Sequence, residues 1–227
     1  MQAQDVMTTK VVTVAPDTPV TEIAKLLLER HISAVPVVSD DRRLLGIVSE
    51  GDLIHELGQE GAKRAWWLDL VASPQTRAQA YLKGHGRLAC DVMTRSIISV
   101  MPDTPLPEIA RLLEARRIKR VPVLRDGELV GIVSRADLLR AFALLAPAGA
   151  AASADDRELR ERLTVEFEEA GLAWHPYVNI VVSDGAVHLW GVVATREEAE
   201  GLRLAASRVP GVAGVESHLA VHPMHAV

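Results

Sequence analysis

The chain contains two copies of one sequence pattern, and this duplication constrains the fold more than any other feature. Asp-Val-Met-Thr at 5–8 returns at 91–94, and Pro-Asp-Thr-Pro and Val-Pro-Val recur at the same offset of 86 residues. Over 34 aligned positions, 5–38 and 91–124 are identical at 19 without a gap. A repeat this long predicts two copies of a small domain rather than a solenoid of short units. We expect the copies to pack about a pseudo-twofold axis, with paired clefts between them.

Each copy predicts the element order strand, helix, strand, strand, helix, which gives an α+β fold. In the first copy we expect strands at 11–14, 35–38 and 44–48, and helices at 20–28 and after Ser49. Thr18 is expected as the N-cap of the first helix and Pro19 as its first residue. In the second copy the corresponding elements are expected at 97–100, 106–113, 121–124 and 129–133, with a last helix through Phe142.

The two copies are expected at 1–54 and 91–145, and the 55–90 segment between them has no repeat character. We expect a helical insert there. Two adjacent tryptophans, Trp66 and Trp67, cannot share one face of a helix. The insert therefore either covers the flank of a copy or contacts a partner.

An Ala-rich linker at 146–154 leads to a third domain at 155–222, for which we expect the order αββαβ. Its expected elements are a helix carrying Leu159, Leu163 and Phe167, strands at 178–183 and 186–193, a helix opened by a capping box at 195–198, and a strand at 215–221. Asp-Gly between the first two strands predicts a tight hairpin. Residues 223–227 are expected to be a frayed tail.

Composition limits the class of protein. A net charge of −5 and a pI near 5.9 argue against a nucleic-acid partner, because such proteins usually carry a basic surface. The single cysteine, Cys90, excludes an internal disulfide and fits a reducing compartment. The sequence shows no secretory signal and no apolar run long enough to span a membrane. We therefore expect a soluble cytoplasmic protein.

The residues that favour ligand binding lie in the pattern Gly-Ile-Val-Ser-x-x-Asp at 46–52 and 131–137. A serine at a strand end and the start of a helix can hold a phosphate, and the aspartate can accept hydrogen bonds from ribose hydroxyls. Ser-x-x-Asp is also a helix-capping arrangement that needs no ligand. Both interpretations remain open from the residues alone.

Other chemistry finds no support in the sequence. There is no Walker loop, no dinucleotide-binding glycine fingerprint and no recognisable Ser-His-Asp arrangement, so we expect neither an enzyme nor a bound cofactor. His222 and His225 lack the convergent cysteines or carboxylates of a metal site, and we expect no metal.

The repeated motifs closely resemble a tandem pair of CBS domains, the Bateman module, over 5–54 and 91–142. The resemblance implies composite clefts that bind an adenosyl ligand such as AMP, ADP, ATP, S-adenosylmethionine or NAD, usually in a sensor. Carried over residue by residue, the first cleft combines Ser49 and Asp52 with Ile97, Ile98, Ile118, Lys119, Arg120 and Pro122. The second combines Ser134, Arg135 and Asp137 with Val11, Val12, Ile32, Ser33, Ala34 and Pro36.

Charge distinguishes these two expected clefts. The first receives Lys119 and Arg120 and is expected to favour phosphate, although Glu50 lies between its serine and aspartate. The alternative is that both cations are ordinary solvated surface residues.

The third domain resembles a BON domain through its αββαβ order and its spaced glycines. BON domains are associated with contact to phospholipid or envelope surfaces, and the family has no known catalytic residues. The combination predicts a non-enzymatic adenine-nucleotide sensor, homodimeric through the CBS pair, with the BON domain as output or docking module. The alternative is a ligand-free dimerisation scaffold whose BON domain contacts a membrane surface or a protein partner.

Overall fold

The structure is a computed structural model that describes residues 1–59, 88–145, 154–172 and 178–222. The chain divides into two compact units. Unit 1 consists of Met1–Val11, Ser99–Arg125 and Val130–Val227, and unit 2 consists of Val12–Ile98 and Asp126–Leu129. Residues 60–87 of the expected insert, including Trp66 and Trp67, nearly all of the linker and the C-terminal tail lie outside the described residues. Within the described residues, no helix is both long and apolar enough to cross a membrane.

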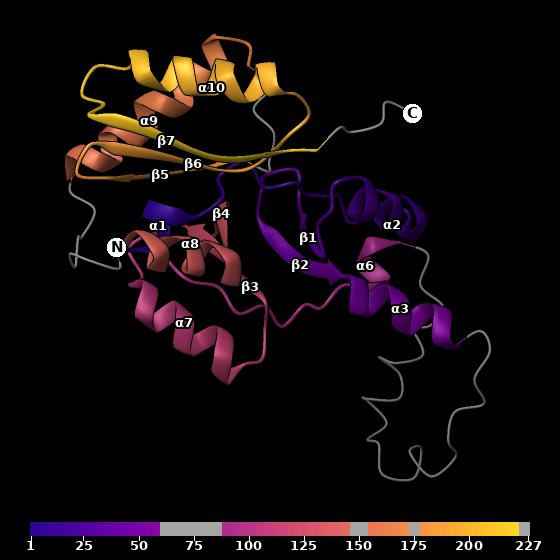
Figure 1. Ribbon diagram of the computed structural model, residues 1–227. Helices are drawn as coiled ribbons and strands as arrows, with labels where there is room; N and C mark the ends of the chain where they lie inside the picture. The colour runs from indigo at the N-terminus through magenta and orange to yellow at the C-terminus, as the bar shows by residue number, and fades with distance from the viewer. Residues whose placement is uncertain (60–87, 146–153, 173–177, 223–227) are drawn as a thin grey trace. The chain divides into compact units, whose positions relative to one another are not determined.

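Unit 2 contains the first repeat (Figure 1). Its elements are α2 (Val20–Glu29), β1 (Ala34–Val38), β2 (Leu44–Ser49), α3 (Glu50–Gln59) and the short α6 (Ala89–Val92). Strands β1 and β2 pair antiparallel, with Val35 opposite Val48. The core forms because Ile23 and Leu27 on one face of α2 pack with apolar residues of both strands.

Unit 1 contains the second repeat and the C-terminal domain. Its elements are α1 (Ala3–Val6), α7 (Leu106–Ala115), β3 (Arg120–Arg125), β4 (Glu128–Ser134), α8 (Arg135–Leu145), α9 (Ala154–Glu169), β5 (Val178–Ser183), β6 (Ala186–Val193), α10 (Arg196–Arg208) and β7 (Gly214–Val221). The mixed helix and strand content and the order of the repeats confirm the α+β prediction.

Two local predictions were wrong. The expected strands at 11–14 and 97–100 are reduced to single parallel bridges, Val14 to Val37 and Val100 to Val123. A proline and a turn follow each bridge at once, so the extended run ends before it can add a second pair. The N-cap of α2 is Pro19 rather than Thr18. The Thr18 carbonyl instead accepts the backbone N–H of Ala89, at 2.8 Å.

The two Asp-Val-Met-Thr segments are exchanged between the repeats. Thr8, near the N-terminus, forms a bridge with Ile132 of the second repeat, whereas Thr94 forms a bridge with Ile47 of the first. In each short helix the aspartate closes the first turn, with Asp5 accepting the Gln2 N–H at 2.6 Å. Each repeat therefore needs a segment that the sequence places next to the other copy.

The motif glycines are explained by this exchange. A Cβ on Gly46 would lie 2.7 Å from Cγ of Met93, and one on Gly131 would lie 2.9 Å from Cγ of Met7. Both methionines are buried, at 4% and 6% exposure. Only glycine lets the strand approach the exchanged segment this closely.

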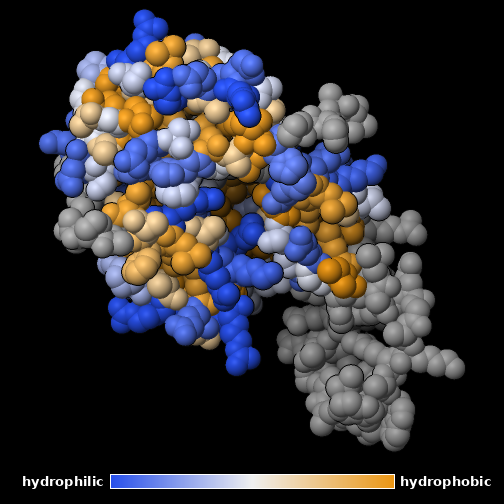
Figure 2. Space-filling model, in the orientation of Figure 1, coloured by the Kyte–Doolittle hydropathy of each residue, from blue (hydrophilic) through white to orange (hydrophobic). Residues whose placement is uncertain are grey.

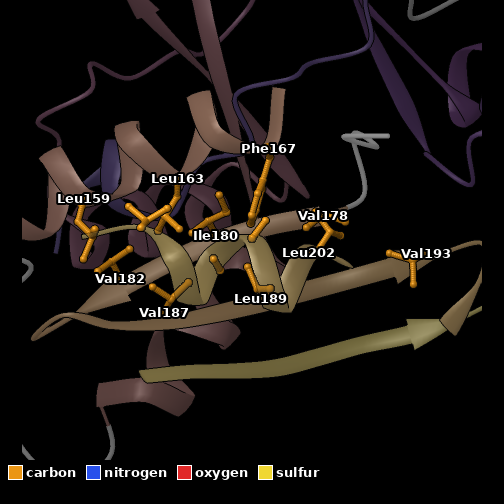
Figure 3. Close-up of a cluster of buried hydrophobic side chains, with 13 residues drawn as sticks. Leu159, Leu163, Phe167, Val178, Ile180, Val182, Val187, Leu189, Val193 and Leu202 are labelled. Atoms are coloured by element: carbon orange, nitrogen blue, oxygen red, sulfur yellow. The ribbon is translucent and has the colours of Figure 1, made fainter. Parts of the chain in front are cut away.

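The C-terminal domain has the predicted αββαβ order. Its sheet is ordered β5-β6-β7, with β5 and β6 antiparallel and β6 and β7 parallel. The hairpin turn has positive φ at Asp184 and Gly185, as its tight geometry requires. Figure 3 shows the core between α9, α10 and one sheet face, where Leu163, Phe167 and Leu202 meet the strands.

Candidate functional site

The first repeat builds a strand-to-helix turn around Asp52. Ser49 ends β2, and Asp52 lies in the first turn of α3. The Ser49 backbone N–H and hydroxyl both donate to Asp52 Oδ2, at 3.0 and 2.7 Å. The Thr94 hydroxyl donates to Asp52 Oδ1 at 3.4 Å, which links the exchanged segment to the turn. Asp52 is half-buried.

The second repeat builds the same turn around Asp137. The Ser134 backbone N–H and hydroxyl donate to Asp137 Oδ2, at 2.8 and 2.7 Å. The Asp137 N–H in turn reaches the Ser134 oxygen at 3.4 Å. Both turns thus contain the capping bonds that the sequence allowed, so a ligand must compete with bonds already made.

The contacts of the second carboxylate oxygen of Asp137 distinguish its turn from the turn around Asp52. Asp137 Oδ1 accepts Arg140 Nη1 at 2.8 Å and Asn179 Nδ2 at 3.1 Å. Asn179 belongs to β5, and its amide also donates to the Val6 carbonyl at 2.7 Å. Asp137 is 3% exposed. The C-terminal domain therefore covers the carboxylate that the sequence assigned to ribose binding.

Further polar contacts join the C-terminal domain to the N-terminal segment of unit 1. The Arg160 guanidinium donates to the carbonyls of Gln4, Met7 and Ile180, at 2.9, 2.7 and 2.8 Å. Desolvation lowers the pKa of Arg160 to about 10, while the charges of Asp5, Asp137 and Glu161 oppose that shift.

An ion pair extends this contact. Arg157 Nε lies 2.7 Å from Oδ1 of the buried Asp5 side chain, and the hydrogen bond to Asp5 raises the pKa of Arg157. On the same contact, Lys10 Nζ lies 3.1 Å from Glu168 Oε1.

Each turn lies beside the preceding strand of its own repeat. Ala34 is the register partner of Ser49, and the Glu50 N–H donates to the Ser33 carbonyl at 3.1 Å. In the second repeat the Arg135 N–H donates to the Lys119 carbonyl at 3.1 Å, and Arg135 Nε donates to the Ile118 carbonyl at 3.2 Å.

The expected grouping assigned these segments to opposite clefts, whereas the backbone contacts place each one beside the turn of its own repeat. Which of them line one ligand site stays a prediction. The start of one hairpin strand lies opposite the end of the other, so Ile118 and Lys119 lie beside Ser134 and Arg135. Ile32, Ser33 and Ala34 accordingly precede or begin the strand paired with Ser49. Pro36 and Pro122 lie deeper in β1 and β3, where their carbonyls accept the N–H groups of Val14 and Val100.

The residues that follow the two Asp-Val-Met-Thr segments divide between the two units. Ile97 and Ile98 follow Thr94 and share unit 2 with Ser49 and Asp52. Val11 shares unit 1 with Ser134 and Asp137, whereas Val12 belongs to unit 2.

The charged residues nearest each turn also differ from the expected grouping. Lys119 and Arg135 flank the Ser134 turn, and the half-buried Arg120 begins the same strand. The Ser49 turn has Ser33 and Glu50 at the matching places. Cationic side chains, the type that can hold a phosphate, therefore lie at the turn of the second repeat, and phosphate binding at either turn stays a prediction.

The residues that cover Asp137 were not among the site residues expected from the sequence. Asn179 lies in a run of apolar residues in β5, and its 4% exposure, with 1% at the adjacent Ile180, shows that this strand is buried on both faces. A polar residue inside an apolar run was the one available signal. Arg157 and Arg160 lie in a helix rich in charged residues, where nothing distinguishes them from solvated neighbours.

Together these features define a duplicated α+β module with a Ser-x-x-Asp strand-to-helix turn in each copy, followed by a small αββαβ domain. The family model for CBS domains matches 3–59 and 89–144, and the model for BON domains matches 155–223. The chain belongs to the CBS domain family and carries a C-terminal BON domain.

Known relatives share the CBS part. The uncharacterized protein MJ1426 of Methanocaldococcus jannaschii is 33% identical over 157 residues, which covers 63% of this chain and 91% of that protein. The chloroplastic CBS domain-containing protein CBSX1 of Arabidopsis thaliana is 34% identical over 135 residues, covering 56% of this chain and 57% of its own length. The crystal structure of CBSX2, also from Arabidopsis thaliana, in complex with AMP has a TM-score of 0.55 at 30% identity, covering 63% of this chain and 97% of CBSX2.

Proposed function

We propose that the chain is a non-enzymatic regulatory protein that binds an adenine nucleotide, most simply AMP, at the turns of its CBS repeats. The observation that carries this proposal is the Ser134 turn, where a hydroxyl and a helix start lie beside Lys119 and Arg135. These groups are suited to a phosphate. The AMP complex of the related CBSX2 supports the choice of ligand. A cytoplasmic location fits the single cysteine.

The BON domain gives this sensor an output. A ribose at Asp137 needs the carboxylate oxygen that now accepts the Asn179 amide. Nucleotide binding at the second repeat and docking of the BON domain therefore compete for one atom. A ligand shifts such an equilibrium only by its differential affinity for the two states. AMP binding at Asp137 accordingly weakens the hold of the BON domain on the second repeat.

Calorimetric titration of AMP into the full chain tests the binding step. Lys119→Ala with Arg135→Ala should weaken AMP by about 1.5–3 kcal/mol and leave adenosine binding nearly unchanged, because only phosphate contacts are lost. Asn179→Ala should strengthen AMP binding, because it removes the competitor for Asp137. AMP affinity unchanged in both variants contradicts the proposed site.

A cross-linking measurement tests the output step. Lys10→Cys and Glu168→Cys place two thiols where the wild-type ion pair joins the BON domain to the N-terminal segment. In a Cys90→Ser background, a short bis-maleimide should join them efficiently without AMP and more slowly with saturating AMP. Adenosine and a nucleotide lacking adenine serve as controls. An unchanged cross-linking rate means that the BON domain does not respond to the nucleotide.

A ligand-free scaffold is the second candidate, favoured by the completeness of the bonds around Asp137. Every carboxylate oxygen there already has protein partners. In that case the BON contact is permanent, and the domain serves to dock on a membrane surface or a protein partner. Absence of any heat with AMP, ADP, ATP, S-adenosylmethionine and NAD would support this alternative.

A further inference from the structure

Two imidazoles and a carboxylate meet on one face of the C-terminal sheet. Strands β6 and β7 run parallel, with His188 opposite Glu216 and Trp190 opposite His218. Side chains two residues apart on a strand share a face, so these four residues lie together. The alternate residues of β6, Val187 and Leu189, point into the core on the other face (Figure 3).

The spacing of the three polar groups fits a small metal ion. Glu216 Oε2 lies 3.4 Å from His188 Nδ1 and 3.6 Å from His218 Nε2. All three ligand atoms lie within 4.8 Å of one another. Zinc bound tetrahedrally to nitrogen and oxygen at about 2.0–2.2 Å places neighbouring ligand atoms about 3.3–3.5 Å apart.

The burial of His188 is an independent indication. The residue is 8% exposed and its side chain 11%. Apart from the contact with Glu216 at 3.4 Å, Nδ1 has no hydrogen-bond partner among the residues that the structure describes. An unpaired buried nitrogen costs stability, and a bound metal would satisfy it.

The neighbouring side chains suit such a site. The ring of His218 stacks on Trp190 with centroids 3.8 Å apart, which fixes the direction of its nitrogens. Glu216 is exposed and leaves an open side for entry of the ion and for a water ligand. A mixed nitrogen and oxygen set favours zinc or its neighbours in the transition series over Mg²⁺ or Ca²⁺, which prefer oxygen ligands.

We propose that His188, Glu216 and His218 form a binding site for Zn²⁺, with water completing the coordination. The site ties the last strand of the BON domain, β7, to β6. It is independent of the nucleotide clefts, since it uses none of their residues. Metal at this site stabilises the sheet edge of the domain.

Calorimetric titration of ZnCl2 into the chelator-treated full chain tests the site. We expect binding of about one ion and a rise in the thermal midpoint, because the ligand binds the folded state. Glu216→Gln and His218→Gln should each weaken binding at least about tenfold. Glu216 and His218 are exposed enough for both variants to fold, and circular dichroism checks that they do.

The control variant is His222→Gln with His225→Gln, which removes the histidines of the C-terminal tail and should retain wild-type affinity. An excess of Mg²⁺ or Ca²⁺ should not displace Zn²⁺. Wild-type affinity in Glu216→Gln and His218→Gln, or loss of binding in the tail variant alone, would overturn the proposal.

Discussion

Asp52 and Asp137 occupy equivalent positions in the two repeats. Because their environments differ, replacing them should lower the free energy of unfolding by different amounts. Asp137→Ala removes an acceptor that serves Ser134, Arg140 and Asn179, and it leaves buried donors unpaired. We expect a loss of about 2–4 kcal/mol in the free energy of unfolding. Asp52→Ala removes mainly the cap of α3 and should cost about 1 kcal/mol. Urea denaturation measures both, and equal losses would contradict the contact between Asp137 and the BON domain.

The environment of Cys90 should lower the reactivity of its thiol. Desolvation and the adjacent Asp91 raise the pKa of the Cys90 thiol above its ordinary value of 9.0. The thiol should therefore react with iodoacetamide more slowly at pH 8 than a free cysteine does, because only the thiolate attacks.

Asp91→Asn should speed the reaction, since it removes the charge but keeps an oxygen for the Leu88 N–H. The rate followed by mass spectrometry from pH 7 to 10 gives the midpoint directly. The same chain unfolded in urea is the control. A midpoint below 9 in the folded protein would contradict the expected shift.

At the scale of elements, patterns local in sequence predicted the fold well. The Asp-Gly hairpin between β5 and β6 and the Thr195 N-cap of α10 appear at the expected residues, because short-range hydrogen bonds decide both. The Glu198 carboxylate of the expected capping box accepts the Ala194 N–H. The single bridges at Val14 and Val100 differ from the expected strands, because the following prolines end them. The exchange of the two Asp-Val-Met-Thr segments was not predictable, since identical copies give no local signal for which partner each segment joins.

The motif glycines offer a test of that exchange. Gly131→Ala should destabilise the protein by about 1–3 kcal/mol, because the new methyl meets the buried Met7. Gly46→Ala should cost somewhat less: its methyl meets only the side chain of Met93, whereas the one on Gly131 also lies 3.1 Å from the Thr8 carbonyl oxygen.

A double variant supplies the control. In the background of Met93→Ala, the added cost of Gly46→Ala should largely disappear, because the methyl then fills vacated space. Denaturant unfolding of the four chains gives the coupling energy. Additive losses would mean that Met93 does not lie against Gly46 in solution.

Arg160 carries the contact between α9 and the N-terminal segment. Arg160→Met keeps the packing of the stem but leaves the carbonyls of Gln4, Met7 and Ile180 without their donor. We expect a loss of about 3 kcal/mol in the free energy of unfolding. Arg203→Met on α10 is the matched control, because the exposed Arg203 pairs only with Glu200 at the surface and should matter far less. Similar losses in both variants would contradict the role of Arg160.

For the molecule as a whole, the homodimer remains a prediction, but its expected surface changes. The four apolar residues Leu106, Ile109, Leu112 and Leu113 predict a dimer face on α7, but Leu106, Ile109 and Leu113 are buried within their own unit and Leu112 is half-buried. Exposed apolar residues instead occur on α8, where Leu139 and Phe142 are 68% and 72% exposed. Figure 2 shows apolar residues interspersed with polar ones on the visible face.

We predict a dimer formed through this face of α8. Light scattering should give twice the 24.6 kDa of one chain for the wild type. Phe142→Glu should give the monomer mass, because a charge replaces an apolar contact. Leu204→Glu, at the exposed Leu204 of α10, is the control and should stay dimeric. A monomeric wild-type chain would show that the exposed residues of α8 have no such partner.

The candidate site was predictable in its residue types but not in its grouping. Ser49, Asp52, Ser134 and Asp137 take the turn positions that the motif indicates. Lys119 lies beside Arg135 because hairpin pairing brings strand ends together, whereas the expected grouping placed Lys119 with Ser49 and Asp52. The cover supplied by Asn179 depends on contacts across more than 40 residues, for which a single sequence carries no direct signal.

The exchanged segments also govern the order in which the chain can mature on the ribosome. The first eleven residues emerge first, yet their pairing partner, Ile132, is synthesised more than 120 residues later. The first repeat becomes complete only once Thr94 has left the exit tunnel. Contacts of such long sequence separation slow folding. A rearranged chain that begins at Val12, with residues 1–11 moved to a position directly before the second repeat, should therefore refold faster than the natural chain.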